Sequence, residues 1–364
     1  MSRRAYLDWL RGIAVLIMIE AHTLDSWTHT ADRTRAAYKW AIVVGGFGAP
    51  TFLFLAGIAL ALAAGSRLRK GLSDADVAAM ARWRGWQIFG LALLFRLQSA
   101  VLGGGGLQSL LKVDILNVMG LSMLVTAGLW GVSVHASQRA VILASAAAAA
   151  AMLTPIIRAT RLLDWLPDPI EAYVRPIPML TGFTLFPWAG FVLAGGVIGL
   201  WLDSARTPRD ERRVIILLTW LGPALAMAGY AAALLPPIYA ETSFWTSSPT
   251  FFLVRLGVLT TAIPIAYAWT TVVRGQSPLQ EMGIASLFVY WVHVEMVYGI
   301  LSSPIHRRLT FEQALVAFAV FSACLYGLVK LKDRVGGHLG PFAKGSPVTV
   351  EADVPGPARK SGKG

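Results

Sequence analysis

The sequence is dominated by apolar segments of about 20 residues, separated by short polar stretches. A helix of roughly 20 apolar residues is long enough to cross the hydrocarbon core of a bilayer. Ten segments fit this description: about 8–27, 40–64, 84–102, 113–132, 139–157, 182–202, 213–235, 251–273, 284–301 and 311–331. Backbone polar groups in lipid must be satisfied within the protein, so we expect an all-α, polytopic integral membrane protein.

The composition excludes an ordinary water-soluble domain. Only 14% of the 364 residues are charged and 55% are hydrophobic, whereas about a quarter of the residues in a soluble domain are charged. We expect residues 1–332 to form one transmembrane domain and residues 333–364, rich in Gly, Pro and Lys, to form a disordered basic tail. The "GGGG" at 103–106 predicts a flexible turn outside the membrane.

The net charge of +12 is explained by topology. With both termini cytoplasmic, the inside segments hold 20 Lys and Arg residues, the outside loops hold nine, and three fall within predicted spans. This excess follows the positive-inside rule. The basic character therefore gives no reason to expect a nucleic-acid partner.

Charged residues interrupt the first predicted span. Along a helix, Asp8, Arg11, His22 and Asp25 fall on one face together with two apolar residues, while Glu20 points to another side. Asp8 and Arg11 are one turn apart and can neutralise each other near the cytoplasmic boundary. His22 lies 14 residues after Asp8, about 21 Å further along the helix. This places His22 in the outer half of the membrane.

Four other predicted spans carry polar groups at a similar depth. These groups are Arg96, Asp114, Asn117, Arg255, His293 and Glu295. Ionisable residues inside a membrane usually face the bundle interior or a watery cavity, and they suggest a functional site. A structural alternative is that Glu20 and Glu295 form interhelical ion pairs with Arg96 and Arg255. His22 and His293 differ from the others, because a neutral imidazole can accept or donate a proton near pH 7.

Several aromatic residues lie near the predicted span ends, where Trp and Tyr often anchor a protein at the membrane surface. We interpret these as interfacial anchors: Trp27, Trp40, Trp83, Trp86, Trp245, Tyr290 and Trp291.

Three segments resemble known membrane acyltransferases. "LDWLRGIAVLIMIEAH", residues 7–22, resembles the first span of two related groups. One is the bacterial family that O-acylates cell-surface sugars, and the other is the heparan-α-glucosaminide N-acetyltransferase family. "FGAPTFLFLAGIALALA" (47–63) and "SPLQEMGIASLFVYWVHVEMVYG" (277–299) are similar to the second and a late span of the latter. The resemblance leaves roughly 100–250 to hydropathy alone.

The resemblance implies roles for particular residues. Asp8, Arg11 and Gly12 match the opening motif, and His22 matches the catalytic His of the O-acylating group. In the heparan-type enzymes the essential His lies further along, in the first outer loop, where this chain has His29. We prefer His22 and keep His29 as the alternative.

The resemblance also implies a reaction: transfer of an acetyl or other acyl group from cytoplasmic acetyl-CoA to a sugar hydroxyl or amine on the other side of the membrane. A His base removes the acceptor's proton, directly or through an acyl-His intermediate. Arg96, Arg255 or Asn117 are candidate donors to the developing oxyanion. Cationic residues near the inner boundary are candidates to bind the phosphates of coenzyme A: Arg11, Arg67, Arg69, Arg82 and Arg84.

The candidate site is therefore divided into two sets. The predicted catalytic residues are His22, His29, His293 and Glu295. The predicted substrate-binding residues are Asp8, Arg11, Glu20, Arg96, Asp114, Asn117 and Arg255. We expect acetyl-CoA as co-substrate but no tightly bound cofactor or metal. The expected partners are the lipid bilayer, the acyl-CoA donor and a sugar or glycan acceptor; a homodimer stays open.

Two other functions fit the same polar layer. One is a transporter or flippase for a lipid-linked or sugar substrate, with these residues forming a midplane site. The other is an electron-transfer protein in which His22 and His293 ligate a haem iron. The family resemblance favours the acyltransferase and a bacterial inner membrane as its location.

Overall fold

The protein is a bundle of helices. The computed structural model describes residues 4–102, 106–273, 275 and 277–338, and none of these residues lies in a β-strand. The first half contains α1 (Ala5–Trp27), η1 (Thr30–Thr34), α2 (Ala36–Gly45), α3 (Gly48–Leu68), α4 (Asp74–Leu102), α5 (Gly106–Leu111), α6 (Ile115–Trp130) and α7 (Ala136–Ala159). The second contains α8 (Asp168–Glu171), α9 (Leu185–Ser204), α10 (Pro208–Ala233), α11 (Pro249–Val272), α12 (Pro278–Ile284), α13 (Ser286–Tyr298), η2 (Ile300–Ser302) and α14 (Phe311–His338).

Each of the ten predicted segments coincides with helix, but two of them are broken. The segment 40–64 is divided between α2 and α3 at Gly46–Phe47, and the segment near 284–301 is preceded by the short α12. The helix α14 continues past the predicted domain boundary at 332 to His338. The rest of the predicted tail, and all but Gly106 of the predicted glycine turn, lie outside the described residues.

Six helical segments of the described chain are long and apolar enough to cross a membrane. They are Ala36–Leu68, Ala136–Ala159, Leu185–Ser204, Pro208–Ala233, Pro249–Val272 and Phe311–Val335. The helix α1 is long enough but carries four charged residues within its apolar run. The fold class is therefore an all-helical integral membrane protein, whereas the crossing number of ten stays a prediction.

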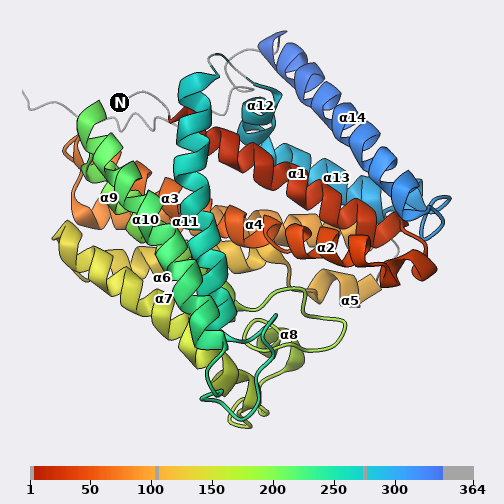
Figure 1. Ribbon diagram of the computed structural model, residues 1–364, viewed down its shortest axis with the longest axis horizontal. Coiled ribbons are helices and arrows are strands. Elements are labelled where there is room, and N and C mark those ends of the chain that lie inside the picture. Colours follow the sequence, from red (N-terminus) through yellow and green to blue (C-terminus); the bar gives the residue numbers. More distant parts are fainter. Residues whose placement is uncertain (1–3, 103–105, 274, 276, 339–364) are drawn as a thin grey trace, which may run out of the picture.

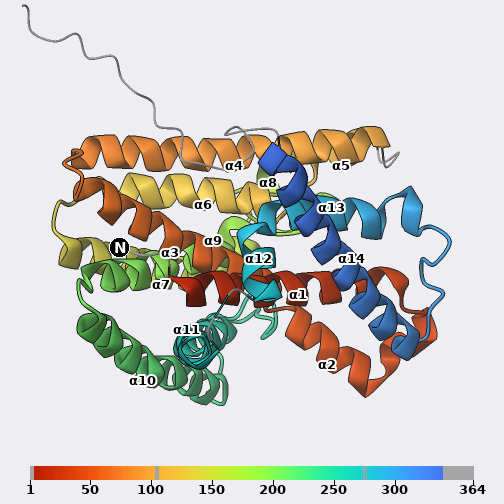
Figure 2. The ribbon, with the colours of Figure 1, turned by 90° about the horizontal axis from the view of Figure 1, so that it is seen from above.

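The long helices are arranged in layers around α1 and α3. Figure 2 shows α4 and α6 along one side of the molecule, α10 and α11 on the opposite side, and α1 and α3 between them. Figure 1 shows α14 at the edge of the molecule, where it packs against α13 and α1.

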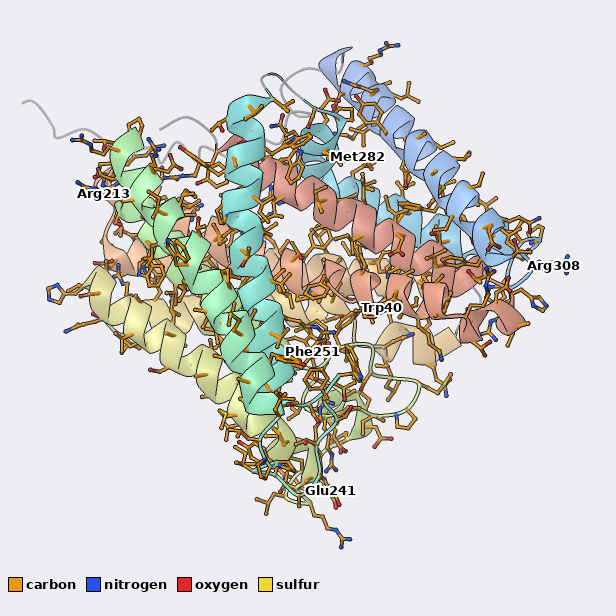
Figure 3. The ribbon with its side chains drawn as sticks, viewed as in Figure 1. Trp40, Arg213, Glu241, Phe251, Met282 and Arg308 are labelled. Atoms are coloured by element: carbon orange, nitrogen blue, oxygen red, sulfur yellow. The ribbon has the colours of Figure 1, made fainter. Side chains whose placement is uncertain are left out.

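The bundle has two opposite ends, named here after residues that Figure 3 labels. At the Arg213 end, Arg4 just before α1 forms an ion pair of 2.6 Å with Glu211 near the start of α10. At the Arg308 end, the Leu309 amide donates to the carbonyl of Trp27, the last residue of α1. The axis of α1 thus runs from the Arg213 end to the Arg308 end.

Two glycines let α1 cross α12 at very short range. A Cβ atom on Gly12 would overlap the carbonyl oxygen of Leu279, and a Cβ on Gly283 would overlap that of Asp8. Close packing through small residues is a common way to join helices in membranes, where water provides no hydrophobic drive between them. The glycine of the opening motif therefore has a packing role.

We expect Gly12→Ala to lower the melting temperature of the detergent-purified protein, because the added methyl must push α1 and α12 apart. Overpacking of this kind costs about 1–3 kcal/mol. The matched control is Gly90→Ala in α4, where an added Cβ meets no atom of the described residues within 4 Å and helix propensity favours Ala by about 1 kcal/mol. Equal melting temperatures for the two variants would contradict this assignment.

Candidate active site

One large cavity runs through the interior of the bundle. Its volume is about 1150 Å³, and α1, α3, α4, α6 and α13 supply most of its walls. The lining extends from Arg11 to Asp25 on α1 and from Gly48 to Arg67 on α3. At 1.5 Å per residue these stretches are about 21 Å and 28 Å long. The cavity therefore extends over most of the roughly 30 Å thickness of a bilayer's hydrocarbon core.

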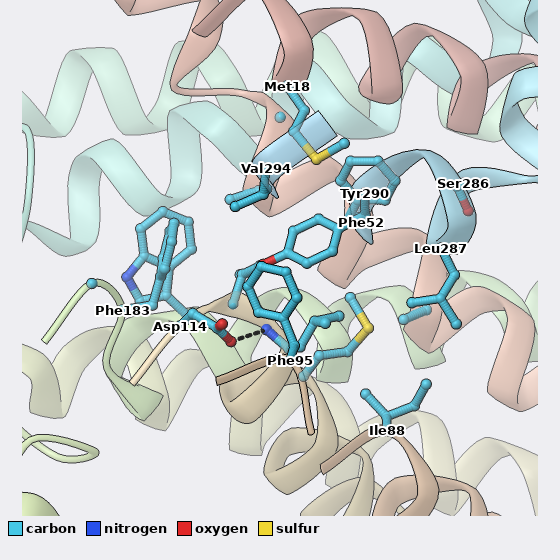
Figure 4. A pocket seen from close by; sticks show the side chains of 18 of the residues that line it. Met18, Phe52, Ile88, Phe95, Asp114, Phe183, Ser286, Leu287, Tyr290 and Val294 are labelled. Atoms are coloured by element: carbon cyan, nitrogen blue, oxygen red, sulfur yellow. Dashed lines mark hydrogen bonds between the residues drawn. The ribbon is translucent and has the colours of Figure 1, made fainter. Parts of the chain in front are cut away.

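Apolar and aromatic side chains line the middle of this cavity. Figure 4 shows Phe52, Phe95 and Tyr290 grouped together, below Met18 and Val294. The rings of Phe95 and Tyr290 have centroids 5.6 Å apart. Tyr290 is buried, so its interpretation as an interfacial anchor is wrong. A lining with few polar groups suits a long ligand segment of low charge.

One further predicted anchor is also wrong, because Trp27 is buried against Phe321. Trp291 is half-buried and donates a hydrogen bond of 2.8 Å from its indole Nε1 to Gln98, so its interpretation as an anchor stays a prediction. By contrast, the other predicted anchors are exposed on the outside of the bundle, as expected for residues at a membrane surface. These are Trp40, Trp83, Trp86 and Trp245.

The Arg213 end of the cavity is cationic. Arg11, Arg67 and Arg84 line it. Arg11 is paired with Asp8 at 3.0 Å, but in the described chain no carboxylate oxygen lies within 4.0 Å of the Arg67 or Arg84 guanidinium. Positive charge at this mouth is thus only partly neutralised by the protein, as in a site for an anion.

A second, smaller cavity of about 520 Å³ adjoins this mouth and shares Arg11 with it. Asp8, Arg69, Lys70 and Asp203 are among its lining residues. Arg69 is held by Asp203 at 2.7 Å. Of the five predicted phosphate ligands, four line one of the two cavities; Arg82 lines neither and is exposed.

Toward the Arg308 end, two histidines from distant parts of the chain are in contact. His22 Nδ1 and His293 Nε2 lie 2.8 Å apart, with the rings parallel to within 4°. His293 Nδ1 lies 2.9 Å from the carbonyl oxygen of Val289, one turn earlier in α13. His22 lines the cavity, whereas His293 is fully buried behind it. Only the His22 imidazole of this pair is therefore accessible to a ligand in the cavity.

Beyond His22, the cavity ends at a small polar network. The Tyr298 hydroxyl donates to Asp25 Oδ2 at 3.2 Å, and Arg33 contacts Asp25 Oδ1 at 3.5 Å. The Tyr298 ring stands edge-on to His22 with centroids 5.5 Å apart. Asp25 is thus already engaged by a hydroxyl and a guanidinium.

Arg96 and Asp114 form an ion pair of 2.7 Å in the cavity wall, where Figure 4 shows Asp114. Asp114 is also the N-cap of α6: its Oδ1 accepts from the amides of Leu116 and Asn117, and Asn117 Oδ1 accepts from the Asp114 amide. The Asn117 Nδ2 donates to the Tyr173 hydroxyl at 3.3 Å, and the side chain does not line the cavity, so it is not available as an oxyanion donor.

Arg255 lines the cavity without an acidic partner. In the part of the chain that the structure describes, no carboxylate lies within 4.0 Å of its guanidinium, which instead lies over the rings of Phe251 (4.1 Å) and Trp188 (5.6 Å). An added Cβ on Gly46 would lie 3.4 Å from Arg255 Nη2, and one on the preceding Gly45 would clash with Ala21 of α1. These contacts bring Arg255 to the depth of His22.

The predicted ion pairs of Glu20 and Glu295 are wrong. Arg96 is paired with Asp114 instead, and neither glutamate lines the cavity. Glu20 Oε2 and Glu295 Oε1 are buried oxygens with no hydrogen-bond partner among the described residues. Neither carboxylate therefore forms an ion pair or a hydrogen bond with a described side chain of the candidate site.

His29 lies outside the cavity at the Arg308 end. Its side chain accepts from the Ala31 amide at 3.2 Å and caps η1, and its own amide donates to Leu309 at 2.7 Å. The ring is exposed. Of the two histidines that the sequence leaves as alternatives, only His22 lines the cavity.

Comparison with known families now adds to this geometry. Residues 3–233 match the family described as heparan-alpha-glucosaminide N-acetyltransferase, catalytic, over more than half of the 364-residue chain. The chain belongs to this family. The expected resemblance is confirmed, and membership in this N-acetyltransferase family implies an acyltransferase. No curated protein matches the chain.

The heparan-α-glucosaminide N-acetyltransferase match covers α1 to α10 and ends before α11. His22, Arg67, Arg84 and the Arg96–Asp114 pair lie inside it. Arg255 on α11 and His293 on α13 lie outside it, yet both lie at the wall of the same cavity or directly behind it.

The geometry contradicts the haem alternative. A metal bound between two histidines needs two bonds of roughly 2 Å each, hence about 4 Å between the nitrogens. His22 and His293 are in direct contact at 2.8 Å, which leaves no room for iron between them.

Reasoning from the sequence missed Tyr298 and the cavity-facing role of Tyr290. Leu287, Tyr290, Val294 and Tyr298 all line the cavity and recur at spacings of three and four residues. That periodicity marks one face of a helix. It was available in the sequence, but no signal there indicated what the face contacts.

Proposed function

We propose that the protein transfers an acetyl group from cytoplasmic acetyl-CoA to the hydroxyl or amine of a sugar on the other side of the membrane. The observation that carries this proposal is that His22 lines the far part of a cavity whose opposite mouth is cationic. A donor with a charged head and a long uncharged arm matches that order of groups. Family membership supports the same chemistry.

In this proposal the Arg213 end is cytoplasmic and the chain crosses the membrane ten times, with both termini inside. The clusters of basic residues near 67–70 and 206–213 support this orientation under the positive-inside rule. The family resemblance supports a bacterial inner membrane.

The donor binds from the Arg213 end. Arg67 and Arg84 hold its phosphates, because both line the mouth and neither is paired with a carboxylate of the described residues. The pantetheine arm then lies between Phe52, Phe95 and Tyr290, so that the thioester reaches the depth of His22.

The acceptor binds from the Arg308 end. His22 takes the proton from its hydroxyl or amine, and the freed oxygen or nitrogen bonds to the acetyl carbonyl carbon. The carbon–sulfur bond breaks, and the proton held on His22 passes to the departing sulfur of coenzyme A. Arg255, which lacks an acidic partner, stabilises negative charge on the thioester oxygen or the acceptor. A two-step route through acetyl-His22 uses the same groups.

The direct test is whether the purified protein in detergent binds acetyl-CoA and transfers its labelled acetyl group to amino sugars or neutral sugars. We expect both binding and transfer. Absence of acetyl-CoA binding would overturn the enzyme proposal, and sugar exchange across proteoliposomes without acetylation would favour the transporter.

A pair of matched variants tests whether the donor binds at the Arg213 end of the cavity and the acceptor at the Arg308 end. We expect Arg67→Gln to weaken acetyl-CoA binding at least tenfold, since a charged hydrogen bond to phosphate contributes about 1.5–3 kcal/mol. Arg255→Gln removes the same charge from the other end, so donor binding should stay within about twofold while turnover falls. The measurement is isothermal titration with acetyl-CoA, alongside transfer assays. An equal loss of donor affinity in both variants would contradict this orientation.

A further inference from the structure

The contacts of His22 and His293 indicate which ring nitrogen of each histidine carries a proton. We propose that His293 is a positioning residue that holds His22 in the tautomer with its proton on Nδ1, so that His22 Nε2 carries the free lone pair. The consequence for catalysis rests on the proposed function, whereas the tautomer itself does not.

The protonated nitrogen of each ring can be assigned by starting from the contact of His293 with the Val289 carbonyl. A carbonyl oxygen only accepts hydrogen bonds, so His293 Nδ1, at 2.9 Å from it, is the donor. In a neutral imidazole the other nitrogen is then an acceptor, which makes His293 Nε2 the acceptor in its 2.8 Å contact with His22. His22 Nδ1 must therefore carry the proton.

The alternative arrangement needs a charged His293 that donates from both nitrogens. His293 is 0% exposed, and no carboxylate of the described residues lies within 4.0 Å of its ring. Burying an unpaired charge in such a place is costly. The two rings that contact His293 in the described chain carry no formal charge when neutral: the Tyr290 ring stands edge-on at 5.7 Å, and the His22 ring is stacked on it from α1. The neutral form is thus the one that the packing favours.

This arrangement prepares His22 as a base. Its Nδ1 is engaged by His293, and no described residue hydrogen-bonds its Nε2. Because the ring lines the cavity, Nε2 is the nitrogen left to take the acceptor's proton. A partner that fixes the tautomer and orientation of a catalytic histidine commonly has a large effect on rate. Here the partner is a second, neutral imidazole, so it orients His22 without adding a negative charge to the membrane interior.

The test uses nitrogen NMR of protein labelled at its histidines, in detergent at about pH 8, where a free imidazole is neutral. The His22 signal is assigned by its loss in His22→Gln. We expect wild-type His22 to be protonated at Nδ1 and bare at Nε2. In His293→Leu, which removes the acceptor, the proton should move to Nε2 or exchange between the two nitrogens. His293→Gln retains an amide oxygen that reaches about as far as Nε2, and should retain the wild-type tautomer.

Kinetics provide the second readout. We expect kcat to fall about 10²-fold or more in His293→Leu, with the KM values for acetyl-CoA and sugar nearly unchanged, and to recover at least tenfold in His293→Gln. A wild-type His22 protonated at Nε2, or equal kcat in the Leu and Gln variants that both bind acetyl-CoA, would overturn the inference. An Nδ1-protonated His22 in a protein that never acylates would leave the tautomer standing and refute the proposed function.

Discussion

The variant His22→Ala is expected to lose acetyl transfer by about 10²–10⁴-fold, the usual contribution of a general base. His22 is the imidazole that faces the cavity, and no second histidine of the described chain lines it. Binding of acetyl-CoA should persist, because the cationic mouth lies about 16 Å away along α1, at Arg11. The measurement is a single-turnover assay with labelled acetyl-CoA, together with titration of donor binding.

The matched control is His29→Ala. His29 caps a single 3₁₀ turn at the surface and does not line the cavity, so its loss should change the rate less than about threefold. Full activity in His22→Ala would show that the base is another group. A large loss in His29→Ala, with the protein folded, would instead return the role to the first outer loop.

Much of the fold could be predicted because the bilayer permits few alternatives. Apolar length and the need to satisfy the backbone within each segment predict helices at all ten places. The break at Gly46–Phe47 was missed because the hydropathy there is continuous, although the sequence from Gly45 to Pro50 is rich in residues that interrupt helices. The helix α4 begins at Asp74, ten residues before the predicted span, because a helix can extend beyond the membrane with a polar surface.

The site was predictable only within single helices. The stripe on α1 was identified from spacing, and four of its members line the cavity: Arg11, Met18, His22 and Asp25. Contacts between helices were not predictable, because they depend on how each helix is rotated about its axis. His22 and His293 are 271 positions apart, and nothing in either segment indicates that their rings meet. For the same reason the sequence suggested a glutamate as the partner of Arg96, whereas its partner is Asp114, the N-cap of α6.

The largest effect on stability is expected from Arg96→Met. Both partners of the Arg96–Asp114 pair are largely buried, with 12% and 7% of their side chains exposed. Removing the guanidinium leaves the Asp114 carboxylate unpaired in the membrane interior, and breaking a buried pair in this way costs about 3–5 kcal/mol. We therefore expect a markedly lower melting temperature in detergent.

The double variant Arg96→Met/Asp114→Asn separates the buried charge from the cap. Asn is as good an N-cap as Asp, so the hydrogen bonds to the amides of Leu116 and Asn117 remain while the unpaired charge disappears. The double variant should therefore recover most of the stability lost in Arg96→Met. If it recovers stability and still acylates, the pair is structural, as the wall position of Arg96 suggests. If it is stable and inactive with acetyl-CoA still bound, the guanidinium acts on the reacting groups, and Arg96 joins Arg255 in stabilising the charge that develops beside His22.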